Sequence, residues 1–589
     1  MLTSRQSSFN LTHISLALAG LMWVLPFLHY RHQYPLTTFE QEWLSALMGV
    51  LSLTLLLTGD YWQAPRLPRI VQLPAFLIAL VLLQSSLGMM AYFDQSLLYL
   101  LYLLFTLLLM MLGARLREVF GLEFLAVVLA GFLLVGAELS ALIGILQHYR
   151  WHSWFDSVVV MKVSTGVYGN LAQPNHFASY ITLGLISLGV LFGQRKLPAG
   201  FVLALALPLL FVLTLSGSRS SWLYLLFMLL LAWRGMKTLP QLRPVMHYCV
   251  VLLAGFVLMH GVVQLSFMKG DGSNFDIFQR VADTSSGSIR LQLWHEAWLI
   301  FKQSPWMGAG FGQFAWQHFQ LGPELRQVNI NGLYNNAHSL LFQLAAEAGI
   351  AGLLVLFAAL GVWFKGVRVC SAPHWWGYAI LGVLAIHSLL EYPLWYVYFL
   401  AVAALLLGMF DETHYRLHMR WVGRGALAAI LLLGLLSLIQ LKSGYQLLKD
   451  TLAIRPVSGN VAVAFERTRA GLIQVHNGSL LRPYADLFMA AYFEVSDEKL
   501  AAKLAVNSNL SRFIPIAPVV YRQACLLAQS GDALAARRVY EQAMWAYPAN
   551  QEARAQLVKL AQKDPAHFAA LLEFALKTEQ EYASAIHNK

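Results

Sequence analysis

Charged residues and cysteines are both scarce in this sequence. Only 12% of its 589 residues are charged and 58% are hydrophobic, whereas soluble domains carry roughly 25% charged residues. This composition excludes a soluble globular protein and predicts a polytopic membrane protein. Cys249 falls in an apolar run, Cys370 in a loop expected inside the cell and Cys525 in the tail. No two of them are expected to meet, so we predict no disulfide.

Long apolar runs occur along most of the first 441 residues. They predict an all-α protein of about 13 transmembrane helices, because each run can cross a bilayer or is a short span that neighbours can bury. The run from Leu11 to Tyr30 has no small-residue cleavage pattern after it, so we expect no cleavable signal peptide. The runs lie at 11–30, 42–59, 72–92, 96–113, 123–147, 174–193, 200–215, 220–233, 245–265, 338–364, 376–391, 394–410 and 425–441.

Lysine and arginine are unevenly divided between alternate loops. With the N-terminus inside, fifteen lie in short inside segments, and the short outside segments hold only Arg31, Arg150, Lys162 and Arg219. Positive residues are retained on the cytoplasmic side. We therefore expect the 148–172 loop, the large 266–337 loop and the chain after about residue 442 to lie outside. The net charge of +11 follows from this topology and does not indicate nucleic-acid binding.

The tail, residues 442–589, is alanine-rich and is predicted to be a soluble helical domain that follows a transmembrane catalytic domain at 1–441. The spacing of a tetratricopeptide repeat is seen at Ala524, Gly531, Ala536, Tyr540, Ala543 and Pro548. A weaker copy is seen at Ala491, Ala502 and Pro515. Such repeats stack into a concave protein-binding surface. The alternative is a helical stub that caps the membrane domain.

His338 stands where a long polar loop runs into an apolar helix, within the sequence Asn-Asn-Ala-His-Ser-Leu-Leu-Phe at 335–342. The unperturbed pKa of histidine suits proton transfer near neutral pH. At the mouth of a span it can face both a lipid-borne and a water-borne substrate. The alternative is an interfacial histidine that bonds headgroups or backbone. Glu347 lies about two and a half turns further on and is expected to face away from His338.

Two further motifs stand at the outer ends of spans. Gln173, Asn175 and His176 open the sixth run, and the alternative is a simple helix start, because proline suits the first turn. The turn at 216–219, Ser-Gly-Ser-Arg, offers amides and the cation of Arg219 to an anion. The alternative there is an ordinary turn with a snorkelling arginine.

The large outer loop carries two patterns. Arg290 and Trp294 share one face of an amphipathic segment, which is typical of an interfacial helix that holds an arginine at the level of lipid phosphates. A lipid contact without catalysis fits equally well. Residues 305–312 are glycine-rich but lack the strand-turn-helix context of a phosphate loop, so we interpret them as a tight re-entrant turn. Beyond this loop, Glu391 and Tyr392 break two spans at the outer face.

Together these motifs resemble the bacterial O-antigen ligase superfamily, and more narrowly its protein O-oligosaccharyltransferase branch, which glycosylates pilins and other proteins. The resemblance covers residues 165–412. One departure is Ser339, where the family has asparagine. The motifs that carry it are Gln-Pro-Asn-His at 173–176, Ser-Gly-Ser-Arg at 216–219, Arg290 with Trp294, Pro-Trp-Met-Gly-Ala-Gly at 305–310, Asn-Ala-His at 336–338 and Glu-Tyr-Pro at 391–393.

The resemblance implies a GT-C-like glycosyltransferase of the bacterial inner membrane. Its donor would be an oligosaccharide on undecaprenyl diphosphate, and its acceptor a serine or threonine of a periplasmic protein such as pilin, with no cofactor and no metal. The residues themselves support this reading. His338 is the outward-facing candidate base, and Arg219 and Arg290 are the outer-face cations for a departing diphosphate. The donor-binding residues would be Gln173, Asn175, His176, Glu391 and Tyr392.

Other functions remain open at this stage. Ligation of O-antigen to lipid A–core and polymerisation of glycan repeat units both share the membrane half of the protein. A lipid or glycan transporter would show inverted repeats or polar residues through the bilayer midplane, whereas the candidate residues gather at one face. The outer side lacks an Asp-x-Asp metal-binding pair. If transfer needed a metal, the candidate ligands would be Glu391 and the loop carboxylates Asp271, Asp276 and Asp283.

Overall fold

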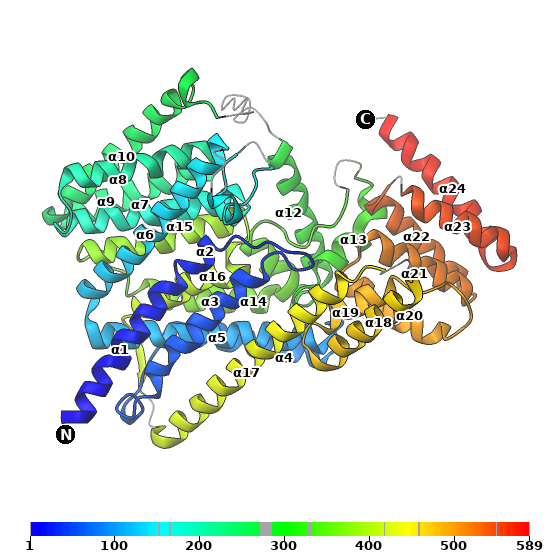
Figure 1. Cartoon of the computed structure of the whole chain (residues 1–589), viewed down its shortest axis with the longest axis horizontal. Helices are drawn as coiled ribbons and strands as arrows, with labels where there is room; N and C mark the ends of the chain where they lie inside the picture. The colour runs from blue at the N-terminus through cyan, green and yellow to red at the C-terminus, as the bar shows by residue number, and fades with distance from the viewer. Residues whose placement is uncertain are drawn as a thin grey trace. The chain divides into compact units, whose positions relative to one another are not determined.

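The computed structural model describes residues 2–150, 154–163, 166–270, 285–327, 331–416, 419–456, 460–548 and 550–587 (Figure 1). Asp271, Asp276 and Asp283 lie outside these described residues. The chain forms two compact units. Unit 1 comprises Met1–Phe76, Tyr102–Ser285 and Leu356–Leu438, and unit 2 comprises Leu77–Leu101, Ser286–Val355 and Ile439–Lys589.

Helices dominate both units. Unit 1 holds α1 (Leu2–Met22), α2 (Leu25–Leu28), α3 (Phe39–Ser52), α6 (Leu122–Tyr149), α7 (Pro174–Gly193), α8 (Ala199–Leu215), α9 (Ser220–Thr238), α10 (Arg243–Val262), α15 (Ala372–Leu390) and α16 (Val397–Met409). Unit 2 holds α12 (Ser285–Gln303), α13 (Phe314–Leu325), α18 (Val461–Gly478), α19 (Arg482–Ala490), α20 (Leu500–Phe513), α21 (Ala517–Gln529), α22 (Ala533–Ala546), α23 (Gln551–Lys563) and α24 (Pro565–His587). The division falls inside α4 (Gln72–Ser86), α5 (Phe93–Phe120), α14 (Leu340–Phe364) and α17 (Arg420–Leu452).

All thirteen expected apolar runs coincide with helices, so the chain is a multi-pass, mainly helical membrane protein. Eight helices of the described chain are long and apolar enough to span a bilayer, including α5, α6, α7 and α14. The other five runs correspond to α3, α8, α9, α15 and α16. Of these, α8 has 17 residues and α16 has 13, and short spans such as these need neighbouring helices or a thinner bilayer.

The most deeply buried span of unit 1 is α7. In its most apolar 18-residue stretch 89% of the residues are buried, against 22–50% in the other candidate spans. It packs against α6, α8, α15 and α9. The N-terminus of this central helix carries the Gln-Pro-Asn-His motif, so the packing of unit 1 holds that motif in a rigid frame.

Positively charged segments of unit 1 that the sequence assigns to the inner side meet one another. Strand β1 (Arg66–Pro68) pairs antiparallel with β2 (His414–Arg416), the only sheet in the described part of the chain. Nearby, the Arg117 guanidinium lies 2.7 Å from a Glu412 carboxylate oxygen. The charge pattern assigns all of these segments to the same side of the membrane, and their contacts agree with that assignment.

The tail helices α21 to α24 follow one another in the orange to red part of Figure 1. Helices α21 and α22 pack as a pair around Ala524, Ala536 and Ala543, all fully buried. Small side chains at these positions let the two helices approach closely, as the repeat spacing predicts. In the weaker copy, by contrast, Ala491 and Ala502 are exposed, so the close small-residue packing is confined to the second copy.

The tail shares a hydrophobic core with α13, which lies in the large 266–337 loop. Phe319 of α13 is 2% exposed and belongs to the same buried cluster as Val520, Tyr540 and Trp545. The N–H of Gly332 also donates a 2.8 Å hydrogen bond to the carbonyl of Ala546. The sequence suggested a boundary at residue 442, whereas the compact unit combines the tail with residues 286–355.

Candidate functional site

The Gln-Pro-Asn-His motif caps the central helix of unit 1. The side-chain oxygen of Gln173 accepts a hydrogen bond from the main-chain N–H of His176 at 2.5 Å, and Pro174 occupies the first helical turn. The motif is therefore a helix start, as the simpler interpretation expected. The same cap also fixes the direction of the next side chain, Asn175.

Asn175 connects two motifs that lie far apart in the sequence. Its Nδ2 donates to Oε1 of Glu391 at 3.1 Å, and its Oδ1 accepts from the Ser218 hydroxyl at 2.8 Å. Glu391 is 4% exposed and Ser218 is 7% exposed. The motifs at 173–176, 216–219 and 391–393 thus meet at one end of α7, α9 and α15.

Aromatic rings enclose His176 beside this polar chain. The His176 ring centroid lies 4.8 Å from that of Tyr396 and 6.3 Å from that of Tyr392. His176 is only 2% exposed, so it supports the cluster from inside. Arg219 is exposed at the start of α9. The part of this cluster that solvent or a ligand can reach consists of Arg219 with the partly exposed Gln173, Asn175 and Tyr392.

Arg290 and His338, the other two predicted site residues, belong to unit 2. Arg290 is partly exposed on α12, one turn before Trp294. The Trp294 ring stacks on Phe342 of α14, with the centroids 5.1 Å apart and the planes 13° apart. Because residues four apart share a helix face, the face of α12 that carries Arg290 packs beside the start of α14, where His338 lies.

His338 sits two residues before α14 in an unusual backbone conformation. Its φ is +49°, a left-handed region that non-glycine residues adopt only when their surroundings hold them there. Its N–H donates to Oδ1 of Asn336 at 3.0 Å. The flanking residues Ala337 and Ser339 are buried, whereas the imidazole is partly exposed. The loop therefore presents the histidine from a fixed base.

The glycine-rich segment 305–312 forms main-chain hydrogen bonds with α14 at the point where that helix is interrupted. The helix is interrupted at Gly349, with φ 62° and ψ −156°. The freed carbonyls of Ala346 and Glu347 accept from the N–H groups of Ala309 and Gly310, at 2.8 and 3.1 Å. The N–H groups of Ile350 and Ala351 donate to the carbonyls of Pro305 and Trp306, at 2.8 and 3.1 Å. This confirms a tight turn in place of a phosphate loop.

Glu347 joins α14 to α13. It is 2% exposed, and its Oε1 accepts from the main-chain N–H of Phe314 at 3.1 Å. Phe314 is the first residue of α13, whose N–H groups have no partner within the helix and favour a carboxylate. Glu347 is thus committed to the α13 terminus, in keeping with the expectation that it does not orient His338.

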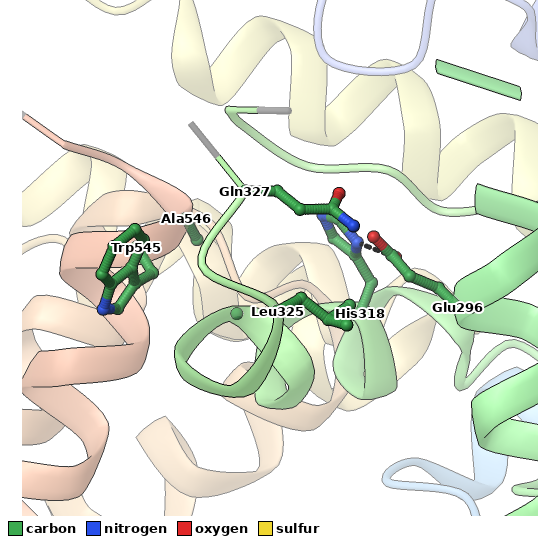
Figure 2. Close-up of a pocket in the computed structure, with 7 residues that line it drawn as sticks. Glu296, His318, Leu325, Gln327, Trp545 and Ala546 are labelled. Carbon is green, nitrogen blue, oxygen red and sulfur yellow. Dashed lines mark hydrogen bonds and ion pairs between the residues drawn. The ribbon is translucent and has the colours of Figure 1, made fainter. Parts of the chain in front are cut away.

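Sequence reasoning missed a buried acid–histidine pair in unit 2. The Nδ1 of His318 on α13 lies 2.6 Å from Oε2 of Glu296 on α12, and the two residues are 8% and 2% exposed. Figure 2 shows the two side chains facing each other beside Gln327, with Trp545 and Ala546 of α22 nearby. The cavity that these residues line has a volume of about 20 Å³, room for about one water molecule.

This pair ties α12, the helix of Arg290, to α13. A spacing of 22 residues between glutamate and histidine has no motif character, so nothing in the sequence marked the pair. Ser218 was likewise seen only as part of a turn. Its direct bond to Asn175 depends on how α7 and α9 pack, which local sequence does not encode.

Three family models match the chain. The O-antigen ligase model matches residues 200–357, a protein glycosylation ligase model matches 167–192, and a model of the C-terminal part of virulence-factor membrane-bound polymerases matches 375–562. The first covers Arg219, Arg290 and His338, and the second covers the cap of α7. The chain is therefore similar to O-antigen ligases over residues 200–357 and to protein glycosylation ligases over residues 167–192.

Two proteins of Acinetobacter baylyi are similar over much of the chain. The General O-oligosaccharyltransferase is 27% identical over 448 residues, which is 75% of this chain and 77% of that relative. The ComP-specific O-oligosaccharyltransferase is 23% identical over 382 residues, 62% of this chain and 65% of the relative. The second alignment thus spans slightly less than two thirds of that relative, while the first covers most of both proteins.

Proposed function

We propose that this protein is an O-linked oligosaccharyltransferase that moves a preassembled glycan from undecaprenyl diphosphate to a serine or threonine of a periplasmic protein such as a pilin. Its matches to the O-antigen ligase and protein glycosylation ligase models support a glycosyltransferase, and its similarity to the General O-oligosaccharyltransferase supports a protein acceptor. The positive-inside bias supports an inner-membrane location with His338 and the tail on the periplasmic side.

The observation that carries the proposal is the presentation of His338. A partly exposed imidazole, in a left-handed backbone held by buried neighbours, stands at the mouth of a membrane helix beside the α12 face that carries Arg290. Strained residues of this kind cluster at functional sites. The position suits a group that must meet a lipid-borne donor and a protein hydroxyl.

The proposed chemistry is a single displacement at the anomeric carbon. His338 accepts the proton of the acceptor hydroxyl while the hydroxyl oxygen bonds to the anomeric carbon. The bond from that carbon to the phosphate oxygen breaks, and undecaprenyl diphosphate leaves. Arg290, in the same unit as His338, offers bidentate hydrogen bonds to the negative charge that develops on the diphosphate. Arg219 of unit 1 is proposed as a second diphosphate ligand from its sequence motif alone.

The polar chain of unit 1 supports donor binding. Asn175 is oriented by both Glu391 and Ser218, and Gln173 and Tyr392 are partly exposed at the same end of α7. Amide and phenol groups of this kind hydrogen-bond to sugar hydroxyls and phosphate oxygens. His176 and Glu391 then act from inside by holding the exposed groups in place.

A second candidate is polymerisation or ligation of glycans onto a glycan or lipid A–core acceptor. The match of residues 375–562 to the polymerase model favours it. A reconstituted assay separates the two functions. Purified protein in nanodiscs receives lipid-linked oligosaccharide together with either a pilin or lipid A–core, and products are read by intact mass. Transfer to the pilin supports the proposal, whereas transfer to lipid A–core alone or growth of the glycan chain contradicts it.

A further inference from the structure

Gln343 lies on the first turn of α14 and belongs to none of the sequence motifs. Its Oε1 accepts a 2.7 Å hydrogen bond from the N–H of Ala337, immediately before His338. Its own N–H donates a 2.8 Å bond to the carbonyl of Ser339, immediately after His338. One residue therefore holds the backbone on both sides of the candidate base.

A mutation of Gln343 can remove only one of these two hydrogen bonds. The bond to Ser339 is main-chain and belongs to the first turn of α14, so it survives any side-chain substitution. The bond to Ala337 depends on the side-chain oxygen alone. Ala337 is fully buried, so its N–H has no access to water if that acceptor is lost, and the loop must then move to satisfy it.

Gln343 is too buried to act on substrate directly. It is 3% exposed, and it shares a face of α14 with Glu347, one turn further on, which is fixed to the start of α13. Phe342, its neighbour in sequence, is stacked under Trp294. Gln343 is thus set in a rigid part of unit 2, from which it can fix the loop above it.

We propose that Gln343 is a positioning residue for His338. Its side-chain oxygen holds the main chain at Ala337, so that His338 keeps the left-handed conformation that aims the imidazole. This inference rests on the proposed role of His338 as the base. Asn336 works with Gln343 by accepting the His338 N–H. A misplacement of about 1 Å at a reacting group can cost roughly 100-fold in rate, so loss of the side-chain acceptor should act on catalysis more than on binding.

The test compares Gln343→Leu with Gln343→Glu in the full-length protein in nanodiscs. Leucine has a similar size and no acceptor, while glutamate keeps an oxygen at the same reach. We expect Gln343→Leu to lower kcat by about 10- to 100-fold with KM for the lipid-linked donor within about threefold of the parent. Gln343→Glu should recover part of kcat, because it keeps the acceptor oxygen but also sets a second carboxylate beside the buried Glu347.

Two further variants keep the result interpretable. Asn336→Ala removes the other hydrogen bond of the loop and should also lower kcat, which provides a test if Gln343→Leu does not fold. Asn507→Leu removes a fully buried structural amide in the tail and should lower thermal stability while leaving kcat per folded molecule unchanged. Equal kcat in Gln343→Leu and parent, or equal losses in the Leu and Glu variants, would overturn the positioning role. A fully active His338→Ala would instead overturn the proposed function.

Discussion

The break in α14 gives a quantitative test of how this region is built. At Gly349 the backbone adopts φ 62° and ψ −156°, a region used almost only by glycine, which costs other residues about 1–3 kcal/mol. A Cβ added there would lie 2.6 Å from the carbonyl oxygen of Pro305 and 2.7 Å from the nitrogen of Gly308. Both contacts are with main chain, so the whole 305–310 segment must shift to relieve them.

That segment makes four main-chain hydrogen bonds across the break, from Ala309, Gly310, Ile350 and Ala351. Each contributes about 1 kcal/mol net. Strain plus the loss of one or two of these bonds predicts that Gly349→Ala lowers the free energy of unfolding by about 2–5 kcal/mol. Gly361 offers a matched control on the same helix, because a Cβ there would meet nothing within 4 Å.

The assay is thermal unfolding in detergent, followed by the amount of monodisperse protein that remains after heating. Gly349→Ala should unfold at a markedly lower temperature than the parent. Its transfer activity should also fall, because Ala309 of the 305–312 segment shares a hydrophobic cluster with Ala337, next to His338. Gly361→Ala should be neutral or more stable by up to about 1 kcal/mol, since alanine is the better helix former. Equal stability of the two variants would refute this account of the break.

Three further predictions concern the polar chain, the topology and the tail. Asn175→Asp sets a second carboxylate against the buried Glu391, so both melting temperature and transfer rate should fall, while Asn175→Gln should keep more of both. Burial raises the pKa of the Cys525 thiol to about 12 and Cys249 is also buried, whereas Cys370 is exposed. An impermeant maleimide should therefore leave intact spheroplasts unlabelled and label Cys370 after lysis, while Leu534→Cys, at a tail position that is 81% exposed, should be labelled without lysis. Labelling of Cys370 in intact spheroplasts would reverse the topology. Deletion of 442–589 removes the core partners of Phe319 and the anchor of Gly332, so transfer to every acceptor should be lost, and selective loss for one acceptor would show that the tail acts only in recruitment.

The sequence predicted the parts of the fold that depend on local composition. Apolar runs located helices, eight of which in the described chain could span a bilayer, and alanine spacing located the close packing of α21 and α22. Burial in lipid or against a neighbouring helix imposes a simple pattern on the chain. It also predicted that 305–312 is a turn, since no strand precedes it. The motifs at 173–176, 216–219 and 391–393 were grouped because the charge pattern assigned them to one side of the membrane, and they meet around Asn175.

The features that the sequence did not reveal depend on contacts between distant segments. Gln343 is a single amide in a long apolar helix, and its role becomes visible only when the loop at Ala337 folds back onto it. The pairing of Glu296 with His318 requires α12 to lie against α13. In the weaker repeat the sequence predicted more than the structure contains. Ala491 and Ala502 have the repeat spacing but are exposed.

The most direct test of the central claim is single-turnover transfer by purified His338→Ala in nanodiscs, with lipid-linked oligosaccharide, a pilin acceptor and a chelator present. Removal of a general base typically costs about 100- to 10,000-fold, so the parent should convert the acceptor to its glycosylated mass while His338→Ala binds donor and leaves the acceptor unchanged. Parental rates in His338→Ala would contradict the role of this histidine, and loss of parental activity on adding chelator would contradict a metal-independent transfer.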